Sequence, residues 1–141
     1  YEIELEGDTK KIQIESRVIG DLAINHIIPT AVEYQNLLIK NVTGLKELFS
    51  EKEFKELSHE QLFTIKKISE RIQLIRKLSE EMREARKTAN QVENPRKQAG
   101  EYNSKVIPFF EKIRREVDKL ELVVSDEYWP LPKYRELLFN R

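Results

Sequence analysis

The chain has 141 residues, enough for one domain, and its 25 Lys and Arg residues balance its 25 Asp and Glu residues. Because the formal net charge is zero, the chain has no excess positive charge to attract polyanions, and we expect neither a nucleic acid nor an anionic membrane surface as a partner. The chain contains no cysteine, which excludes disulfides, thiolate zinc sites and a cysteine nucleophile and is compatible with the cytoplasm. No apolar run approaches the ~20 residues of a membrane span, and no signal-peptide pattern opens the chain.

The first predicted helix runs from about residue 8 to residue 49. Apolar or small residues recur at spacings of three and four, the pattern of one helix face. Residues 1–7 are ambiguous, because they alternate like a strand and also fit the helical period. Gly7 and Asp8 fit a break followed by a helix N-cap, so we leave the structure of residues 1–7 open.

Pro29 interrupts this helix without changing the phase of its apolar pattern. A proline inside a helix displaces the carbonyl four residues earlier and removes one hydrogen bond, at a cost of about 3 kcal/mol. We therefore predict a kink at Pro29 rather than two helices. Asn25, His26 and Thr30 carry side chains suited to the carbonyls that the kink frees.

Two further helices are predicted over residues 58–90 and 95–125. Ser58 and Gln61 match a capping box, and the charged residues before Ser58 are assigned to a connection. Asn94 is placed as the cap of the last long helix, and Pro95 lies at its first position, where a missing N–H costs nothing. Pro108 interrupts the last helix without changing phase, so we predict a second kink there.

These elements predict an all-α fold in one domain. Three long helices with single apolar stripes fit an antiparallel three-helix bundle or long helical hairpins, and we predict the bundle. A Trp-Pro-Leu-Pro strap follows, because its two prolines do not extend a helix, and residues 133–139 form a short last helix. The strap and last helix are too apolar to remain in water. Their predicted docking residues are Trp129, Leu131, Tyr134, Leu137, Leu138 and Phe139.

The sequence offers no recognisable catalytic, cofactor-binding or metal-binding constellation. We interpret His26 as a core or kink-satisfying residue and His59 as a solvent-exposed residue of a first helical turn. The acidic residues Glu80, Glu81 and Glu84 lie among basic ones, which is typical of charge pairs on an exposed helix face. The basic residues are Arg83, Arg86 and Lys87. The four glycines form no phosphate-binding loop.

The chain carries long, idiosyncratic segments at residues 11–17, 20–31, 34–36, 118–124 and 129–139. In these segments it resembles the C-terminal region of a type III glutamine synthetase, whereas the middle helix resembles it mainly in character. The resemblance implies a parent enzyme that joins ammonia to glutamate with ATP and Mg²⁺ or Mn²⁺, through a γ-glutamyl phosphate. It also implies that the catalytic residues lie in other parts of the parent, which assembles as stacked rings.

We therefore expect a non-catalytic helical region of a cytoplasmic ligase, cut from a longer chain that continues before Tyr1. Its expected partners are the catalytic domain of the parent and neighbouring subunits, whose contacts it braces. Neither ATP nor a metal is expected in this region itself. The alternative is a free-standing helical-bundle module for protein interaction that shares ancestry with the extension.

Overall fold

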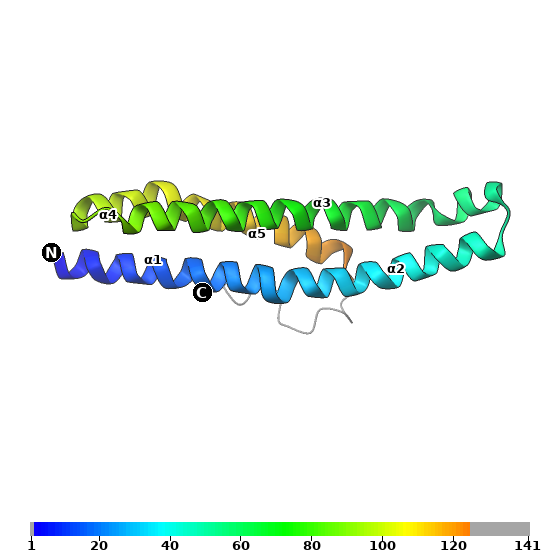
Figure 1. Ribbon diagram of the computed structural model, residues 1–141, viewed down its shortest axis with the longest axis horizontal. Helices are drawn as coiled ribbons and strands as arrows, with labels where there is room; N and C mark the ends of the chain where they lie inside the picture. Colours follow the sequence, from blue (N-terminus) through cyan, green and yellow to red (C-terminus); the bar gives the residue numbers. More distant parts are fainter. Residues whose placement is uncertain (1, 125–141) are drawn as a thin grey trace.

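The computed structural model describes residues 2–124, which fold into long helices without a strand (Figure 1). The predicted all-α class is confirmed for this part of the chain. The six predicted docking residues, the Trp-Pro-Leu-Pro strap and the short helix at residues 133–139 lie outside the described residues. They stay predictions.

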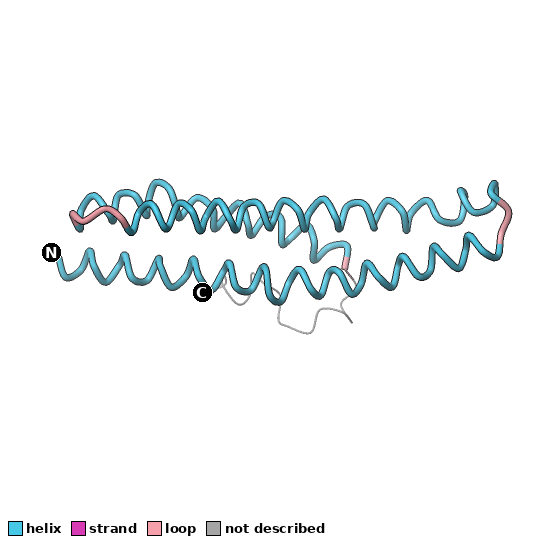
Figure 2. The backbone as a smooth tube through the Cα atoms, in the orientation of Figure 1, coloured by secondary structure: helices cyan, strands magenta, loops and turns pink. Residues whose placement is uncertain are grey.

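The first rod consists of α1 (Glu2–Leu22), a π-helical segment η1 (Ala23–Ile27) and α2 (Ile28–Leu48). Its helix includes residues 2–7, which the sequence left open between strand and helix. It ends at Leu48, and Phe49 has an extended backbone with ψ at 161°. The rod extends along the whole long axis of the molecule (Figure 2).

The second rod is the single helix α3 (Glu51–Asn90), which begins seven residues before the predicted start. The Ser50 hydroxyl accepts the Glu53 backbone N–H at 3.3 Å and donates to the Glu53 carboxylate at 2.9 Å, so Ser50 is the N-cap. The predicted cap, Ser58, is buried and donates to the Phe54 carbonyl at 2.6 Å. The capping-box assignment at Ser58 was therefore wrong. Acidic residues in the first turn favour helix here, because they face the positive end of the helix dipole.

The third rod consists of α4 (Pro95–Glu101), η2 (Tyr102–Val106) and α5 (Ile107–Val123). The predicted cap is confirmed, since the Asn94 side chain accepts the Lys97 backbone N–H at 3.1 Å. Pro95 lies in the first turn, where no N–H is needed.

At both internal prolines the chain inserts a π-helical segment just before the proline. The N–H of Ile28 donates to the carbonyl of Ala23, five residues earlier, and Ile107 does the same with Tyr102. These wider turns precede Pro29 and Pro108, so each proline begins a new α-helical stretch within a continuous rod. Of the three side chains expected to assist at Pro29, Thr30 donates to the His26 carbonyl at 2.8 Å. Asn25 instead donates to Asp21 at 2.7 Å.

Consecutive rods run antiparallel, and the third rod covers only part of the length of the other two (Figure 1). All three rods pack together where α1, α4, η2 and α5 meet α3, whereas α2 and the first half of α3 continue beyond the end of α5 as a two-helix hairpin. The bundle prediction is thus confirmed in part: three long helical rods exist, but among residues 2–124 three-helix packing is confined to one portion.

The core follows one face of each rod. On α3 the fully buried apolar residues recur every seven positions, the spacing of a helix seam that faces a partner continuously. The buried apolar residues are Ile19, Ala23, Ile27, Ile28 and Ala31 of the first rod, Ile68, Ile75, Met82 and Ala89 of α3, and Tyr102, Val106, Ile113, Val117, Leu120 and Val124 from the third rod onward.

The corrected start of α3 leads to a direct test. Ser50→Ala removes the N-cap and should lower the free energy of unfolding by about 1 kcal/mol. Ser58→Ala is the matched variant, because it keeps the buried β-carbon and removes a hydroxyl that bonds within the helix. Its loss in the free energy of unfolding should be about 0.5 kcal/mol or less. Urea unfolding followed by circular dichroism measures both. A larger loss of unfolding free energy for Ser58→Ala than for Ser50→Ala would indicate that the helix begins at Ser58.

Candidate functional site

Both histidines are exposed. His59 was expected to be so, but the prediction of a core or kink-satisfying role for His26 was wrong. The His26 side chain is 49% exposed, and its Nε2 lies 3.9 Å from a carboxylate oxygen of Asp21. The π-helical segment carries Ile27 rather than His26 into the core. No group of three or more His, Cys, Asp or Glu side chains among residues 2–124 is arranged to hold a metal.

The acidic stretch on α3 forms the predicted charge pairs. An Arg83 guanidinium nitrogen lies 3.1 Å from a Glu80 oxygen and 3.9 Å from a Glu84 oxygen. All three side chains are more than half exposed, so the pairs contribute little to stability. The hydrogen bond with Glu80 raises the pKa of Arg83. Within the described part of the chain, no helix is long and apolar enough to cross a membrane.

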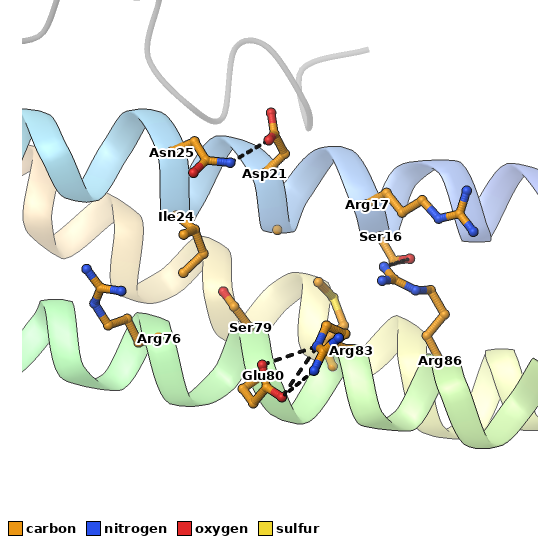
Figure 3. Close-up of a pocket in the computed structure, with 12 residues that line it drawn as sticks. Ser16, Arg17, Asp21, Ile24, Asn25, Arg76, Ser79, Glu80, Arg83 and Arg86 are labelled. Carbon is orange, nitrogen blue, oxygen red and sulfur yellow. Dashed lines mark hydrogen bonds and ion pairs between the residues drawn. The ribbon is translucent and has the colours of Figure 1, made fainter.

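The most distinctive polar feature is a groove between α1 and α3, which we call the arginine groove (Figure 3). It has a volume of about 290 Å³. Arg17 comes from α1, whereas Arg76, Arg83 and Arg86 come from α3, where Arg76 lies two turns before Arg83 and Arg86 one turn after it. Single-helix patterns do not reveal this site, because it forms only when two antiparallel rods bring their arginines together. The remaining lining residues are Ser16, Gly20, Asp21, Ile24, Asn25, Ser79, Glu80 and Met82.

Arg86 is held inside this groove by a neutral partner. Its guanidinium donates to the Ser16 hydroxyl at 3.1 Å, and that hydroxyl donates to the Gln13 carbonyl at 2.8 Å. Burial lowers the pKa of Arg86, and the positive charge of Arg17 lowers it further. Both effects act against the charged form, so an anion in the groove would relieve them.

Ser79 adds a hydroxyl group without a partner. The residue is 8% exposed, and its Oγ atom is buried with no hydrogen bond among the described residues. Ser79 lines the arginine groove, where its side chain projects from α3 toward α1 (Figure 3). A buried polar group without a partner costs about 1–3 kcal/mol, so Ser79 is an energetic defect in the isolated chain.

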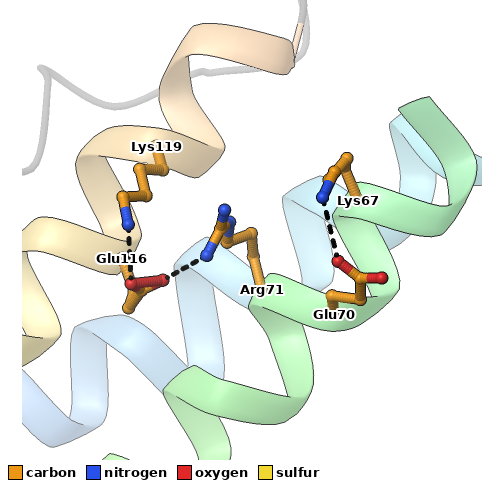
Figure 4. Close-up of polar contacts among 5 residues, drawn as sticks. All are labelled: Lys67, Glu70, Arg71, Glu116 and Lys119. Atoms are coloured by element: carbon orange, nitrogen blue, oxygen red, sulfur yellow. Dashed lines mark hydrogen bonds and ion pairs between the residues drawn. The ribbon is translucent and has the colours of Figure 1, made fainter. Parts of the chain in front are cut away.

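A buried ion pair connects α3 to α5 next to the three-helix core (Figure 4). Glu116 is nearly buried, and one of its carboxylate oxygens accepts from Arg71 at 2.9 Å. Its other oxygen lies 3.3 Å from the Lys119 ammonium. This carboxylate is satisfied from two rods, which makes it a structural group rather than a reactive one.

A second surface lies on the two-helix hairpin, which the described part of the third rod does not cover. We call it the apolar tip. Phe63 is 56% exposed and Leu48 is 78% exposed. Leu62 of α3 is 45% exposed, because α5 ends before this level of the hairpin. A groove of about 510 Å³ lies along α3 here, and its lining residues are Phe54, Lys55, Ser58, His59, Leu62, Phe63 and Lys66. The apolar tip comprises Leu37, Ile39, Leu48, Phe49, Phe54, Leu57, Leu62 and Phe63.

Comparison with known proteins relates the chain to the glutamine synthetases. Residues 1–46 match the family model described as the glutamine synthetase C-terminal domain. Over 99% of its length the chain is 53% identical to a glutamine synthetase of Bacteroides fragilis and 28% identical to a type-3 glutamine synthetase of Dictyostelium discoideum. It spans 19% of the length of each of these relatives. The resemblance to type III glutamine synthetases is confirmed.

The buried ion pair predicts a stability difference between two glutamates of α5. Glu116→Gln should lower the free energy of unfolding by about 1–3 kcal/mol, because it removes a charge that two cations share in a nearly buried position. Glu111→Gln is the control: Glu111 pairs with Arg114 at 3.2 Å but is 61% exposed, so the loss should stay below about 0.5 kcal/mol. Equal losses in urea unfolding would show that the Arg71–Glu116 contact adds nothing.

We predict that removing the Ser79 hydroxyl stabilises the chain. Ser79→Ala should raise the free energy of unfolding by about 1 kcal/mol in a buffer without multivalent anions, since it removes the unpartnered hydroxyl. Ser16→Ala, which breaks the contact with Arg86, should lower stability instead. Thermal unfolding of both variants in Tris chloride distinguishes these signs. A destabilised Ser79→Ala variant would mean that the hydroxyl has a stabilising partner in solution.

Proposed function

We propose that this chain, a relative of the type III glutamine synthetases over its whole length, is the non-catalytic C-terminal helical region of such an enzyme. The observation that carries the proposal is the 53% identity to a bacterial glutamine synthetase across 99% of the chain, together with the match of residues 1–46 to the C-terminal domain model. The parent reaction is then the ATP-dependent ligation of ammonia to glutamate. ATP and Mg²⁺ or Mn²⁺ belong to that reaction, and we assign them to the parent's catalytic part in the cytoplasm.

Within that enzyme we infer a bracing role, in which the hairpin carries contacts to the catalytic domain or a neighbouring subunit. Two observations support this role. The hairpin extends beyond the described third rod, and its apolar tip exposes large side chains such as Leu48 and Phe63 on both helices. Exposed apolar residues gathered on one element are typical of protein interaction surfaces. The predicted docking residues from Trp129 to Phe139 would add a second contact to the same assembly.

The bracing role is tested in the full-length parent enzyme. The double substitution Leu62→Ser and Phe63→Ser should weaken assembly about tenfold or more, because each half-exposed side chain contributes about 1 kcal/mol when it is buried in a contact. Analytical ultracentrifugation measures the assembly, and γ-glutamyl transfer measures the activity separately. Ile14→Ser is the control, since Ile14 is 60% exposed on α1 and lies outside the apolar tip.

Unchanged assembly in the double variant would reject the bracing role of the apolar tip. Circular dichroism of the 141-residue chain with the same substitutions checks that the hairpin still folds. The chain alone should show no γ-glutamyl transfer, and measurable turnover would reject the non-catalytic assignment. A start codon close to Tyr1 in the source gene would favour the free-standing interaction module instead.

A further inference from the structure

We propose that the arginine groove between α1 and α3 is a binding site for an oxyanion, a phosphate or carboxylate group. This inference is independent of the proposed bracing role, which concerns the apolar tip at the hairpin end of the molecule. The groove lies instead at the level where three rods pack together, so its walls are supported by the core. Such support holds a site in shape before its ligand arrives.

The groove has more positive charge than its own carboxylates neutralise. Of its four arginines, only Arg83 has an ion pair among residues 2–124, with Glu80 and Glu84. Arg17 and Arg76 make no hydrogen bond or ion pair within this described range. The Asp21 carboxylate is occupied by the Asn25 amide at 2.7 Å and by His26 at 3.9 Å.

Arg86 is the third arginine of the groove without an ion pair, and it is partly buried. Arg86 donates to Ser16, a neutral acceptor that leaves the guanidinium charge uncompensated. Its desolvation is a cost that a well-placed anion would offset. A guanidinium presents a planar fork of N–H donors, which matches the paired oxygens of a carboxylate or phosphate.

Ser79 gives the second, independent indication of a ligand. Its hydroxyl is nine-tenths buried, lines the groove and has no partner in the described structure. Buried hydroxyls in native proteins are nearly always paired, so this one indicates a missing acceptor. An oxyanion between α1 and α3 would accept from Ser79, with Arg76 on one side of this serine along α3 and Arg83 and Arg86 on the other (Figure 3). The same placement explains why a hydroxyl is present where an alanine would pack without cost.

The proposal is tested by titrating the 141-residue chain with inorganic phosphate at constant ionic strength, with sodium chloride as the balancing salt. Isothermal titration calorimetry should show saturable binding with a dissociation constant in the millimolar range or tighter. Arg76→Gln and Arg86→Gln should each weaken binding about fivefold or more, because each removes a charged donor. Ser79→Ala should weaken it about threefold, as expected for a neutral donor.

Arg115→Gln is the matched control, because Arg115 is an exposed arginine of α5 outside the groove. Its phosphate affinity should stay within about twofold of the wild-type value. The absence of saturable binding, or an equal loss in Arg115→Gln, would overturn the proposal. Arg76 is exposed, so Arg76→Gln should retain the fold and keep the test valid if Arg86→Gln does not fold.

Competition with a hexaglutamate peptide identifies the source of the oxyanion. If the peptide displaces phosphate and binds about tenfold or more tightly than phosphate, the site takes carboxylates of a polypeptide. If phosphate binds more tightly than the peptide, the site takes a free phosphate group. Each of these results supports the groove as an oxyanion site, whereas binding of neither ligand rejects it.

Discussion

The packing of α3 against both other rods is the constraint on which the rest of the structure depends. With 40 residues α3 is about 60 Å long, and its own backbone hydrogen bonds do not give such a helix a fixed place in a fold. Its buried apolar residues from Ile68 to Ala89 recur every seven positions, and they face the first rod and the third rod at once. Removing either partner would expose half of this seam to water.

The two internal prolines show how a long rod remains continuous despite a missing donor. In each case a π-helical segment precedes the proline, at residues 23–27 and 102–106. The widened turn moves hydrogen bonds one residue further back and keeps Ile27 and Val106 in the core. Tyr102, fully buried at the start of the second segment, donates its hydroxyl to the Asn90 side chain at the end of α3. The proline sites are thus part of the core rather than interruptions of it.

Unequal rod lengths divide the molecule into two parts with different properties. Where three rods meet, apolar side chains are covered and some polar groups at the edge are held by contacts between rods, as in the Arg71–Glu116 pair and the Arg86–Ser16 hydrogen bond. Where only α2 and α3 continue, residues of the same apolar pattern stay partly exposed, as Leu62 does. The first part is suited to a defined polar site, and the second is suited to contact with another surface.

The sequence by itself determined the helical class, the number of long rods and the cap at Asn94, because helix periodicity and capping depend on neighbours within a few residues. It also carried the family resemblance, which rests on local strings of residues. It misplaced the start of α3, where the acidic first turn after Ser50 resembled a charged connection.

Only the tertiary structure decided which residues of each stripe are buried, how far the third rod reaches and which arginines of α1 and α3 line one groove. These features depend on the register between rods, and a shift of one helical turn would separate Arg17 from Arg86 without changing any local pattern. The physical reason is that the net charge of a site and the burial of its residues depend on side chains from several helices. The residue pattern of a single helix contains only that helix's own contribution to the site.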